Sequence, residues 1–215
     1  MKNLEIYIHI PFCVRKCEYC DFLSFPADDD AKLRYVKGLM AEMIFYGPLM
    51  KNYQVSSVYI GGGTPSSIDE QWIAALMEGV FDCFNVLPDA EISIECNPGT
   101  LSREKLLAYM DAGINRLSIG LQSANNDELK RLGRIHTFEQ FVTNYEVARN
   151  VGFKNINVDL MYGLPGQSAS QYMATVNKII RLHPDHISAY SLIVEKGTPF
   201  YEKYKFDMVR QEAGM

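Results

Sequence analysis

Short runs of β-branched and other apolar residues alternate along this chain with longer segments in which apolar residues recur at helical spacing. The runs cover residues 4–10, 55–60, 91–95, 116–121, 156–160 and 186–192. Strands that are separated by helices pair in parallel, because each connection must cross back to the same end of the sheet. The pattern therefore predicts an α/β fold of six βα units. At 215 residues the chain is slightly shorter than a complete (β/α)8 barrel of about 250 residues.

Capping signals and the end of the repeat define the predicted organisation further. Thr137 and Gln140 form a capping box for a helix that ends at Gly152. No linker is visible inside the six units, and no seventh unit follows them. We expect a core domain over residues 1–195, with residues 196–215 as the start of a truncated or missing C-terminal region.

Three cysteines, Cys13, Cys17 and Cys20, directly follow the first predicted strand at CxxxCxxC spacing. A loop this short can turn three thiolates toward one point. A closed structural zinc site and an ordinary ferredoxin cluster each take four ligands. Three sulfurs on a [4Fe–4S] cluster would leave one iron open for a substrate or cofactor, so the pattern favours such a cluster.

The cysteines also admit interpretations other than a cluster. A zinc site could take His9 as its fourth ligand, although a histidine between Ile8 and Ile10 on a strand is more often a hydrogen-bonded core residue. A disulfide framework is disfavoured, because the five cysteines are odd in number and no signal peptide precedes them. Cys83 and Cys96 are interpreted as small buried hydrophobic residues rather than further ligands.

The composition argues against several classes of function. Hydrophobic residues make up 47% of the chain and charged residues 22%, as in ordinary soluble globular proteins. A formal net charge of −5 without a basic run argues against nucleic acid as a partner. No apolar stretch approaches the ~20 residues needed to span a bilayer. Reduced thiols and the absence of an export signal point to the cytoplasm.

The predicted strand ends carry unusual residues. In parallel βα architectures, ligands bind at the C-terminal edge of the sheet, where the βα loops lie. The residues delivered there are the cysteine loop, the run Gly61-Gly62-Gly63-Thr64-Pro65, Glu95 with Asn97, Gln122 with Ser123, Asp159 with the turn 162–167, and Tyr190 with Ser191. Convergence of these loops on one rim predicts a binding site.

Each of these features also has a plainer interpretation. The glycine run can let the backbone approach a ligand closely, or it can be a flexible turn. Glu95 and Asp159 can accept hydrogen bonds from ribose hydroxyls, or they can be exposed charges at strand ends. Arg134 alone is typical of a solvated or salt-bridged side chain, and His136 of a residue at a helix start.

Several segments together resemble the radical S-adenosylmethionine superfamily: IYIHIPFCVRKCEYCDF, YIGGGTPS, IECNPG, RLSIGLQS, LGRIHT and DLMYGLPGQ. Within it they are similar to the oxygen-independent coproporphyrinogen III oxidase group, and especially to its HemW-like heme-chaperone branch. The resemblance covers residue 6 to about residue 199. It implies a partial TIM-type (β/α)6 barrel, which agrees with the strand count.

The resemblance also implies roles for individual residues. Cys13, Cys17 and Cys20 would hold a [4Fe–4S] cluster whose open iron is chelated by S-adenosylmethionine. The implied contacts of that cofactor are Tyr7 and Tyr19 around the cluster loop, Gly62, Gly63 and Thr64 at its methionyl end, and Glu95 at its ribose. In the oxidase, residues around a second S-adenosylmethionine are matched here by Gln122, Arg134, Asp159 and Ile193.

Departures from the oxidase pattern favour the chaperone branch. The oxidase has CxxxCxxCxC, whereas Phe22 stands two residues after Cys20, and only twelve residues precede Cys13. The implied function is a heme chaperone that binds heme and hands it to an acceptor protein, with an electron donor as a further partner. The alternative is an anaerobic oxidase that converts coproporphyrinogen III to protoporphyrinogen IX by radical oxidative decarboxylation.

Overall fold

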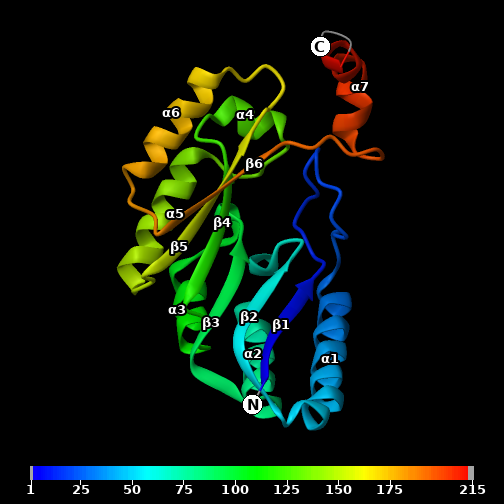
Figure 1. Ribbon diagram of the computed structural model, residues 1–215, viewed down its shortest axis with the longest axis vertical. Coiled ribbons are helices and arrows are strands. Elements are labelled where there is room, and N and C mark those ends of the chain that lie inside the picture. The colour runs from blue at the N-terminus through cyan, green and yellow to red at the C-terminus, as the bar shows by residue number, and fades with distance from the viewer. Residues whose placement is uncertain (1, 213–215) are drawn as a thin grey trace.

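The computed structural model describes the backbone of residues 2–212 and the side chains of residues 2–205. Within that range, one parallel sheet has the strand order β1-β2-β3-β4-β5-β6 (Figure 1). Its strands are β1 (Lys2–Ile10), β2 (Tyr53–Gly62), β3 (Val86–Cys96), β4 (Arg116–Gln122), β5 (Asn155–Tyr162) and β6 (His186–Ser191). The predicted α/β fold and partial (β/α)6 barrel are therefore confirmed, as an open half-barrel.

Helices connect the strands and cover the outer face of the sheet (Figure 1). They are α1 (Asp29–Tyr46), α2 (Glu70–Cys83), α3 (Arg103–Asp111), α4 (Asn126–Arg131), α5 (Phe138–Val151), α6 (Ala169–Ile180) and α7 (Pro199–Glu212), with short 3-10 turns η1 (Gly47–Met50), η2 (Pro65–Ser67) and η3 (Pro98–Thr100). The capping box of Thr137 and Gln140 is present at the start of α5, and Gly152 ends that helix with a φ of 120°.

Strand boundaries differ from the predicted runs mainly at the N-terminal ends. β3 begins at Val86 rather than at residue 91, because Val86 already pairs with Val55 of β2. The register shifts before the next pair, Ser57 with Glu91, and Pro88 lies within that shift. A proline has no N–H to donate to the neighbouring strand, so it interrupts the regular pairing. The sequence pattern therefore predicts a strand that begins only after Pro88.

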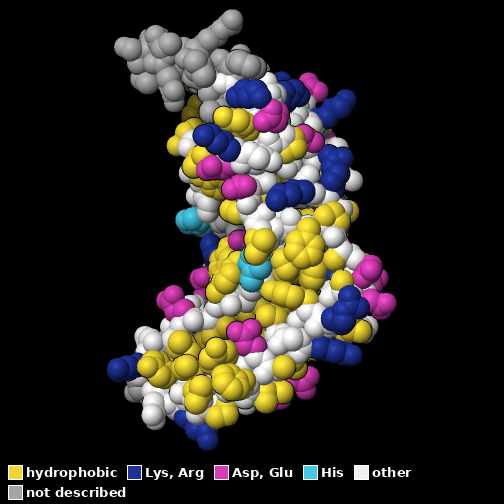
Figure 2. Space-filling view, turned by 90° about the vertical axis from the view of Figure 1, so that its right-hand side faces the viewer, with side chains coloured by type: hydrophobic (Ala, Val, Ile, Leu, Met, Phe, Trp, Pro, Cys, Tyr) yellow, Lys and Arg dark blue, Asp and Glu magenta, His cyan; other side chains and the backbone are white. Residues whose placement is uncertain are grey.

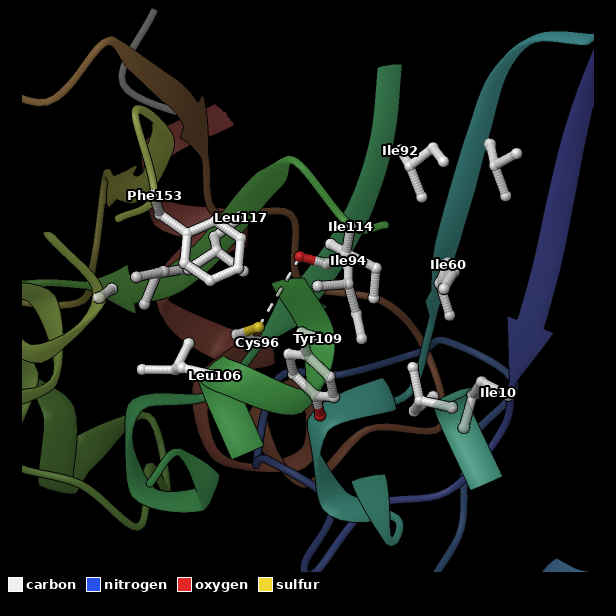
Figure 3. Packing of buried hydrophobic residues seen from close by; sticks show 14 of the residues in the cluster. Ile10, Ile60, Ile92, Ile94, Cys96, Leu106, Tyr109, Ile114, Leu117 and Phe153 are labelled. Atoms are coloured by element: carbon white, nitrogen blue, oxygen red, sulfur yellow. Dashed lines mark hydrogen bonds between the residues drawn. The ribbon is translucent and has the colours of Figure 1, made fainter. Parts of the chain in front are cut away.

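The two faces of the sheet differ in chemistry. Side chains such as Ile60, Ile94 and Leu117 are fully buried in the main hydrophobic cluster beneath the helices (Figure 3). Successive residues of a strand point to opposite faces. The neighbouring residues Glu95 and Ser118 therefore lie on the inner face, where they are paired in register across β3 and β4. The inner face is polar and is left open by the incomplete barrel.

Apolar side chains also gather on the surface that carries β1 and α1 (Figure 2). Ile44, Phe45 and Leu49 are exposed where α1 ends and η1 follows, and Phe22 and Leu23 are exposed in the cysteine loop. Among the helices of residues 2–212, none combines the length and apolar character that crossing a bilayer requires.

The last described helix, α7, begins close to the expected domain boundary at residue 195. Phe200 at its start is buried in a second, smaller hydrophobic cluster with Leu132, Met161 and Leu164. The start of α7 therefore packs against the core described above, while residues 213–215 of the expected C-terminal region lie outside the described residues.

Candidate functional site

A cavity of about 600 Å³ lies on the inner face of the half-barrel, at the C-terminal ends of the strands. It is lined by all but one of the residues that the resemblance assigned to cofactors: Cys13, Cys17, Cys20, Tyr19, Gly62, Gly63, Thr64, Glu95, Gln122, Arg134, Asp159 and Ile193. The strand ends thus converge on one rim, as parallel βα architecture predicts.

Tyr7 is the one assigned residue that does not line this cavity. Its side chain is 58% exposed, and its hydroxyl is 3.0 Å from Nδ1 of His9. The Tyr7 ring stacks on that of Tyr59, with centroids 6.2 Å apart. Tyr59, which the sequence did not single out, occupies the cavity wall in its place.

Backbone hydrogen bonds fix the cysteine loop between β1 and α1. The amide of Phe25 donates to Pro11 O at 2.9 Å, and the amide of Cys13 donates to Phe25 O at 3.2 Å. A third bond, 3.1 Å long, joins the amide of Glu18 to Leu132 O beyond α4. The loop is therefore held both by its own base and by the opposite wall of the cavity.

The three thiols of this loop are half-buried and unpaired, and each has its own polar neighbour. Cys13 Sγ lies 3.4 Å from the Thr64 hydroxyl. Cys17 Sγ accepts from Nη1 of Arg134 at 3.7 Å, whereas Cys20 Sγ lies 4.0 Å from the Ser24 hydroxyl. Burial raises the pKa of the Cys20 thiol, so an external positive charge such as bound iron would favour its thiolate.

The three thiols do not meet at one point, contrary to what the short loop predicts. Among the side chains of residues 2–205, no group of three or more His, Cys, Asp or Glu residues is close enough to hold one metal ion. A [4Fe–4S] cluster offers a separate iron to each thiolate, so its ligands need not meet at one point. Gly63 leaves room beside the first ligand, because a Cβ there would lie 3.0 Å from Cys13 Sγ.

The zinc alternative with His9 finds no support in the geometry. The Nδ1 atom of His9 faces the Tyr7 hydroxyl, and its Nε2 atom lies 3.2 Å from Leu23 O. Both ring nitrogens are therefore engaged outside the cavity. Cys96 is buried as predicted, and Cys83 packs against the main hydrophobic cluster on α2.

The glycine run and Glu95 form one polar unit beside the cysteine loop. The Glu95 carboxylate accepts from the Tyr59 hydroxyl at 2.8 Å and from the amide of Gly62 at 3.1 Å. Gly62 has a φ of 122°, and a Cβ at Gly61 would meet the Tyr59 ring at 2.8 Å. Only glycine permits this approach at low cost. Burial raises the pKa of Glu95, although its two hydrogen bonds act in the opposite direction.

Asp159 belongs to a second polar unit, lower on the inner face. Its carboxylate accepts from Asn157 Nδ2 at 2.7 Å and from the Ser118 hydroxyl at 3.1 Å. Burial raises the pKa of Asp159. Glu95 and Asp159 are thus half-buried carboxylates directed into the cavity, not exposed charges at strand ends. Strand alternation could have identified Ser118 and Asn157, because each lies two residues from a polar residue on the same face.

Gln122 is held in an unusual backbone conformation at the end of β4. Its φ is 74°, and the register with β5 shifts between Gly120 and Gln122. A non-glycine residue in this region costs about 1–3 kcal/mol, and such strain is concentrated at functional sites. The bulge directs the amide of Gln122 into the cavity wall, where it accepts from the Tyr190 hydroxyl at 2.9 Å.

Arg134 differs from its plain interpretation, whereas His136 lies at a helix start as expected, directly before the N-cap residue Thr137 of α5. Arg134 is neither solvated nor salt-bridged: its guanidinium lines the cavity and contacts Cys17 Sγ and Gly120 O. His136 is buried behind it, with its ring nitrogens near Asn97 Oδ1 and Leu121 O. Burial and the Arg134 charge lower the pKa of His136 to about 3. A neutral His136 therefore braces the site and does not supply a proton near pH 7.

Comparison with known proteins identifies the group to which these features belong. The family model of the Radical SAM superfamily matches residues 7–179. Heme chaperone HemW of Bacillus subtilis is 40% identical over 196 residues, which make up 91% of this chain and 52% of that protein. Heme chaperone HemW of Escherichia coli is 39% identical over 203 residues, covering 92% and 52%. The chain thus spans about half the length of the curated relatives it matches.

Solved structures show the same fold. Coproporphyrinogen III oxidase (HemN) from Escherichia coli, a radical SAM enzyme, superposes with a TM-score of 0.84 at 28% identity, over 95% of this chain and 52% of that chain. Streptococcus suis SuiB bound to S-adenosylmethionine superposes with a TM-score of 0.66 at 19% identity, over 98% and 48%. At that lower identity the likeness shows the fold alone.

Proposed function

This chain belongs to the radical SAM superfamily, and from that premise we propose that it is the cluster-binding core of a heme chaperone. The superfamily implies a [4Fe–4S] cluster and S-adenosylmethionine. The motif resemblance to the HemW branch is confirmed by relatives close to 40% identical. The observation that carries the proposal is the cavity that gathers three thiols, a glycine run and a half-buried carboxylate.

The cysteines would bind the cluster, and the residues that face them across the cavity would bind S-adenosylmethionine. Cys13, Cys17 and Cys20 would hold the cluster, leaving one iron without a protein ligand. When bound, the cluster and S-adenosylmethionine supply one-electron chemistry on a sulfonium compound. The chain's task is to bind, orient and shield these groups.

Glu95 would recognise the ribose of S-adenosylmethionine. Its carboxylate is oriented by Tyr59 and Gly62, and it still has acceptor capacity toward the cavity that it lines. A hydrogen bond to an ionised acceptor contributes about 1.5–3 kcal/mol. The backbone of Gly62 and Gly63 and the hydroxyl of Thr64 offer polar groups to the amino-acid end of the cofactor.

The chaperone function is preferred to oxidase activity. The two relatives named above, close to 40% identical, are heme chaperones, whereas the HemN structure is 28% identical. Phe22 also stands where the oxidase pattern has a further cysteine. The proposal includes heme or a porphyrinogen as ligand, an acceptor protein, an electron donor and a cytoplasmic location. A second S-adenosylmethionine near Gln122, Arg134, Asp159 and Ile193 belongs to the oxidase alternative.

Anaerobic reconstitution with iron and sulfide tests the cluster. Wild-type protein should gain visible cluster absorbance and bind iron and sulfide in equal amounts, and Cys17→Ser should lose both. Cys83→Ser is the matched control, because Cys83 lies on α2 outside the cavity, and it should behave as wild type. Zinc without labile sulfide in the purified wild-type protein would refute the proposal.

A heme titration, paired with an anaerobic assay for protoporphyrinogen, separates the two functions. Stable heme binding without turnover of coproporphyrinogen III supports the chaperone. Turnover without stable heme binding would reverse the preference.

A further inference from the structure

The Arg134 guanidinium is inserted between the cysteine loop and the end of β4. Its Nη2 donates to Gly120 O, and its Nη1 donates to Cys17 Sγ at 3.7 Å. The backbone fixes the position from which it extends, because the amide of Arg134 donates to Leu129 O at 2.9 Å. A Cβ at Gly120 would lie 3.3 Å from Nη2, so the glycine leaves room for this approach.

The charge of Arg134 has no anionic partner among the described side chains. Arg116 is 3.8 Å from Glu91 and Arg149 is 2.7 Å from Asp185, but no ion pair within residues 2–205 includes Arg134. Its Nε atom is buried without a hydrogen-bond partner in that range. Arginine stays protonated, and a cation held in a protein wall is costly unless an anion compensates it.

The ligand sulfur is the group that this cation meets. The potential of an iron–sulfur cluster depends on its net charge and on hydrogen bonds to its sulfurs. A donor on the sulfur and a nearby positive charge stabilise the reduced state, which carries one more electron than the oxidised state. The contact between Arg134 and Cys17 is therefore of a kind that changes the reduction potential of a cluster. This role differs from the cofactor contact that the resemblance implied for Arg134.

We propose that Arg134 sets the reduction potential of the cluster by donating a charged hydrogen bond to Cys17. This inference rests on the proposed function, because it requires a cluster on the three cysteines. Arg134 acts through a ligand of the cluster, so it is a positioning and tuning residue. Its removal makes one-electron reduction of the cluster harder.

The test is a potentiometric titration of reconstituted protein without S-adenosylmethionine, in which dithionite supplies the electron and the reduced cluster is followed by electron paramagnetic resonance. For Arg134→Gln, the equilibrium constant for one-electron reduction should fall at least tenfold, which is about 59 mV toward more negative potential. Arg134→Lys should shift in the same direction by less, because lysine keeps the charge but loses the planar fork.

Arg116→Gln is the matched control for charge. Arg116 lines the same cavity, but it begins β4, four residues before Gly120, or about 13 Å at the rise of a strand. It should change the equilibrium constant less than threefold. If Arg134→Gln holds a full cluster with the wild-type potential, the inference is wrong while the proposed function stands.

Other outcomes are equally informative. Failure of the wild-type protein to bind a cluster would refute the proposed function itself. If Arg134→Gln cannot retain a cluster, Arg134→Lys decides the question. A wild-type potential in that variant would overturn the role of the hydrogen bond, and a shift to more negative potential would support it.

Discussion

The outer and inner faces of the sheet carry alternate residues of the same strands, and the two faces have different roles. On the outer face, Ile94 and Leu117 are fully buried under the helices, and they hold the fold together. On the inner face, the adjacent Glu95 and Ser118 line the cavity. A complete (β/α)8 barrel fills its interior with branched apolar side chains. The open half-barrel does not, so its inner face is available for polar chemistry.

Truncation on the outer face should have the largest effect on stability. Leu117→Ala removes a fully buried side chain from the main cluster and should lower the free energy of unfolding by about 2–5 kcal/mol. Ser118→Ala, one residue along and on the inner face, breaks its hydrogen bonds with Asp159 and Asn157 and should cost about 0.5–1.5 kcal/mol. Urea unfolding measures both values.

Equal losses for these two variants would break the contrast between the faces. That result would mean that the inner polar network contributes as much to folding as the apolar core does.

The second hydrophobic cluster, formed by Leu132, Met161, Leu164 and Phe200, should stabilise the cysteine loop more than the rest of the fold. Phe200 packs on Tyr19 with ring centroids 6.4 Å apart, and its amide donates to Glu18 O at 3.0 Å. Phe200→Ala should therefore accelerate amide exchange of the cysteine loop at least tenfold, equivalent to about 1.4 kcal/mol of local opening. Hydrogen–deuterium exchange reports this directly. Phe22→Ala, at a residue that is 69% exposed in the same loop, should leave the exchange rates near those of wild type.

Stability should depend on pH through the inner carboxylates, with a smaller amplitude. Burial raises the folded-state pKa of Glu95, so ionising it costs stability as pH rises through that value. Glu95→Gln removes this cost, so its stability relative to wild type, measured as the difference in free energy of unfolding, should be greater at pH 7 than at pH 4. Denaturant titrations at the two pH values test the sign. A relative stability that falls between pH 4 and pH 7 would contradict the direction of the pKa shift.

The smallest expected effects are on the affinity for S-adenosylmethionine, and they should differ between variants of Tyr59 and Tyr7. Tyr59→Phe removes one of two protein donors to Glu95 and should weaken S-adenosylmethionine binding by less than about tenfold, or roughly 1.4 kcal/mol. Tyr7→Phe removes only a contact with His9 outside the cavity lining and should change affinity less than about twofold, roughly 0.4 kcal/mol. Isothermal titration of reconstituted protein gives both constants. A larger effect for Tyr7 would favour the assignment made from the family pattern.

Local sequence patterns determined the fold. Hydrophobic periodicity and capping signals depend on residues a few positions apart, so they predicted all six strands and the ends of α5. The cysteine spacing and the strand-end residues also sufficed to predict where a cavity would form, because parallel strands bring their C-terminal ends together.

Tertiary structure alone decided which side chains work together. Arg134 reaches Cys17 across 117 residues of sequence, and Tyr59 reaches Glu95 across 36. In each case the amino-acid sequence shows only which chemical group is present. Whether that group is solvated or becomes a partner of a ligand depends on how curvature of the sheet and packing of the loops place distant backbones side by side.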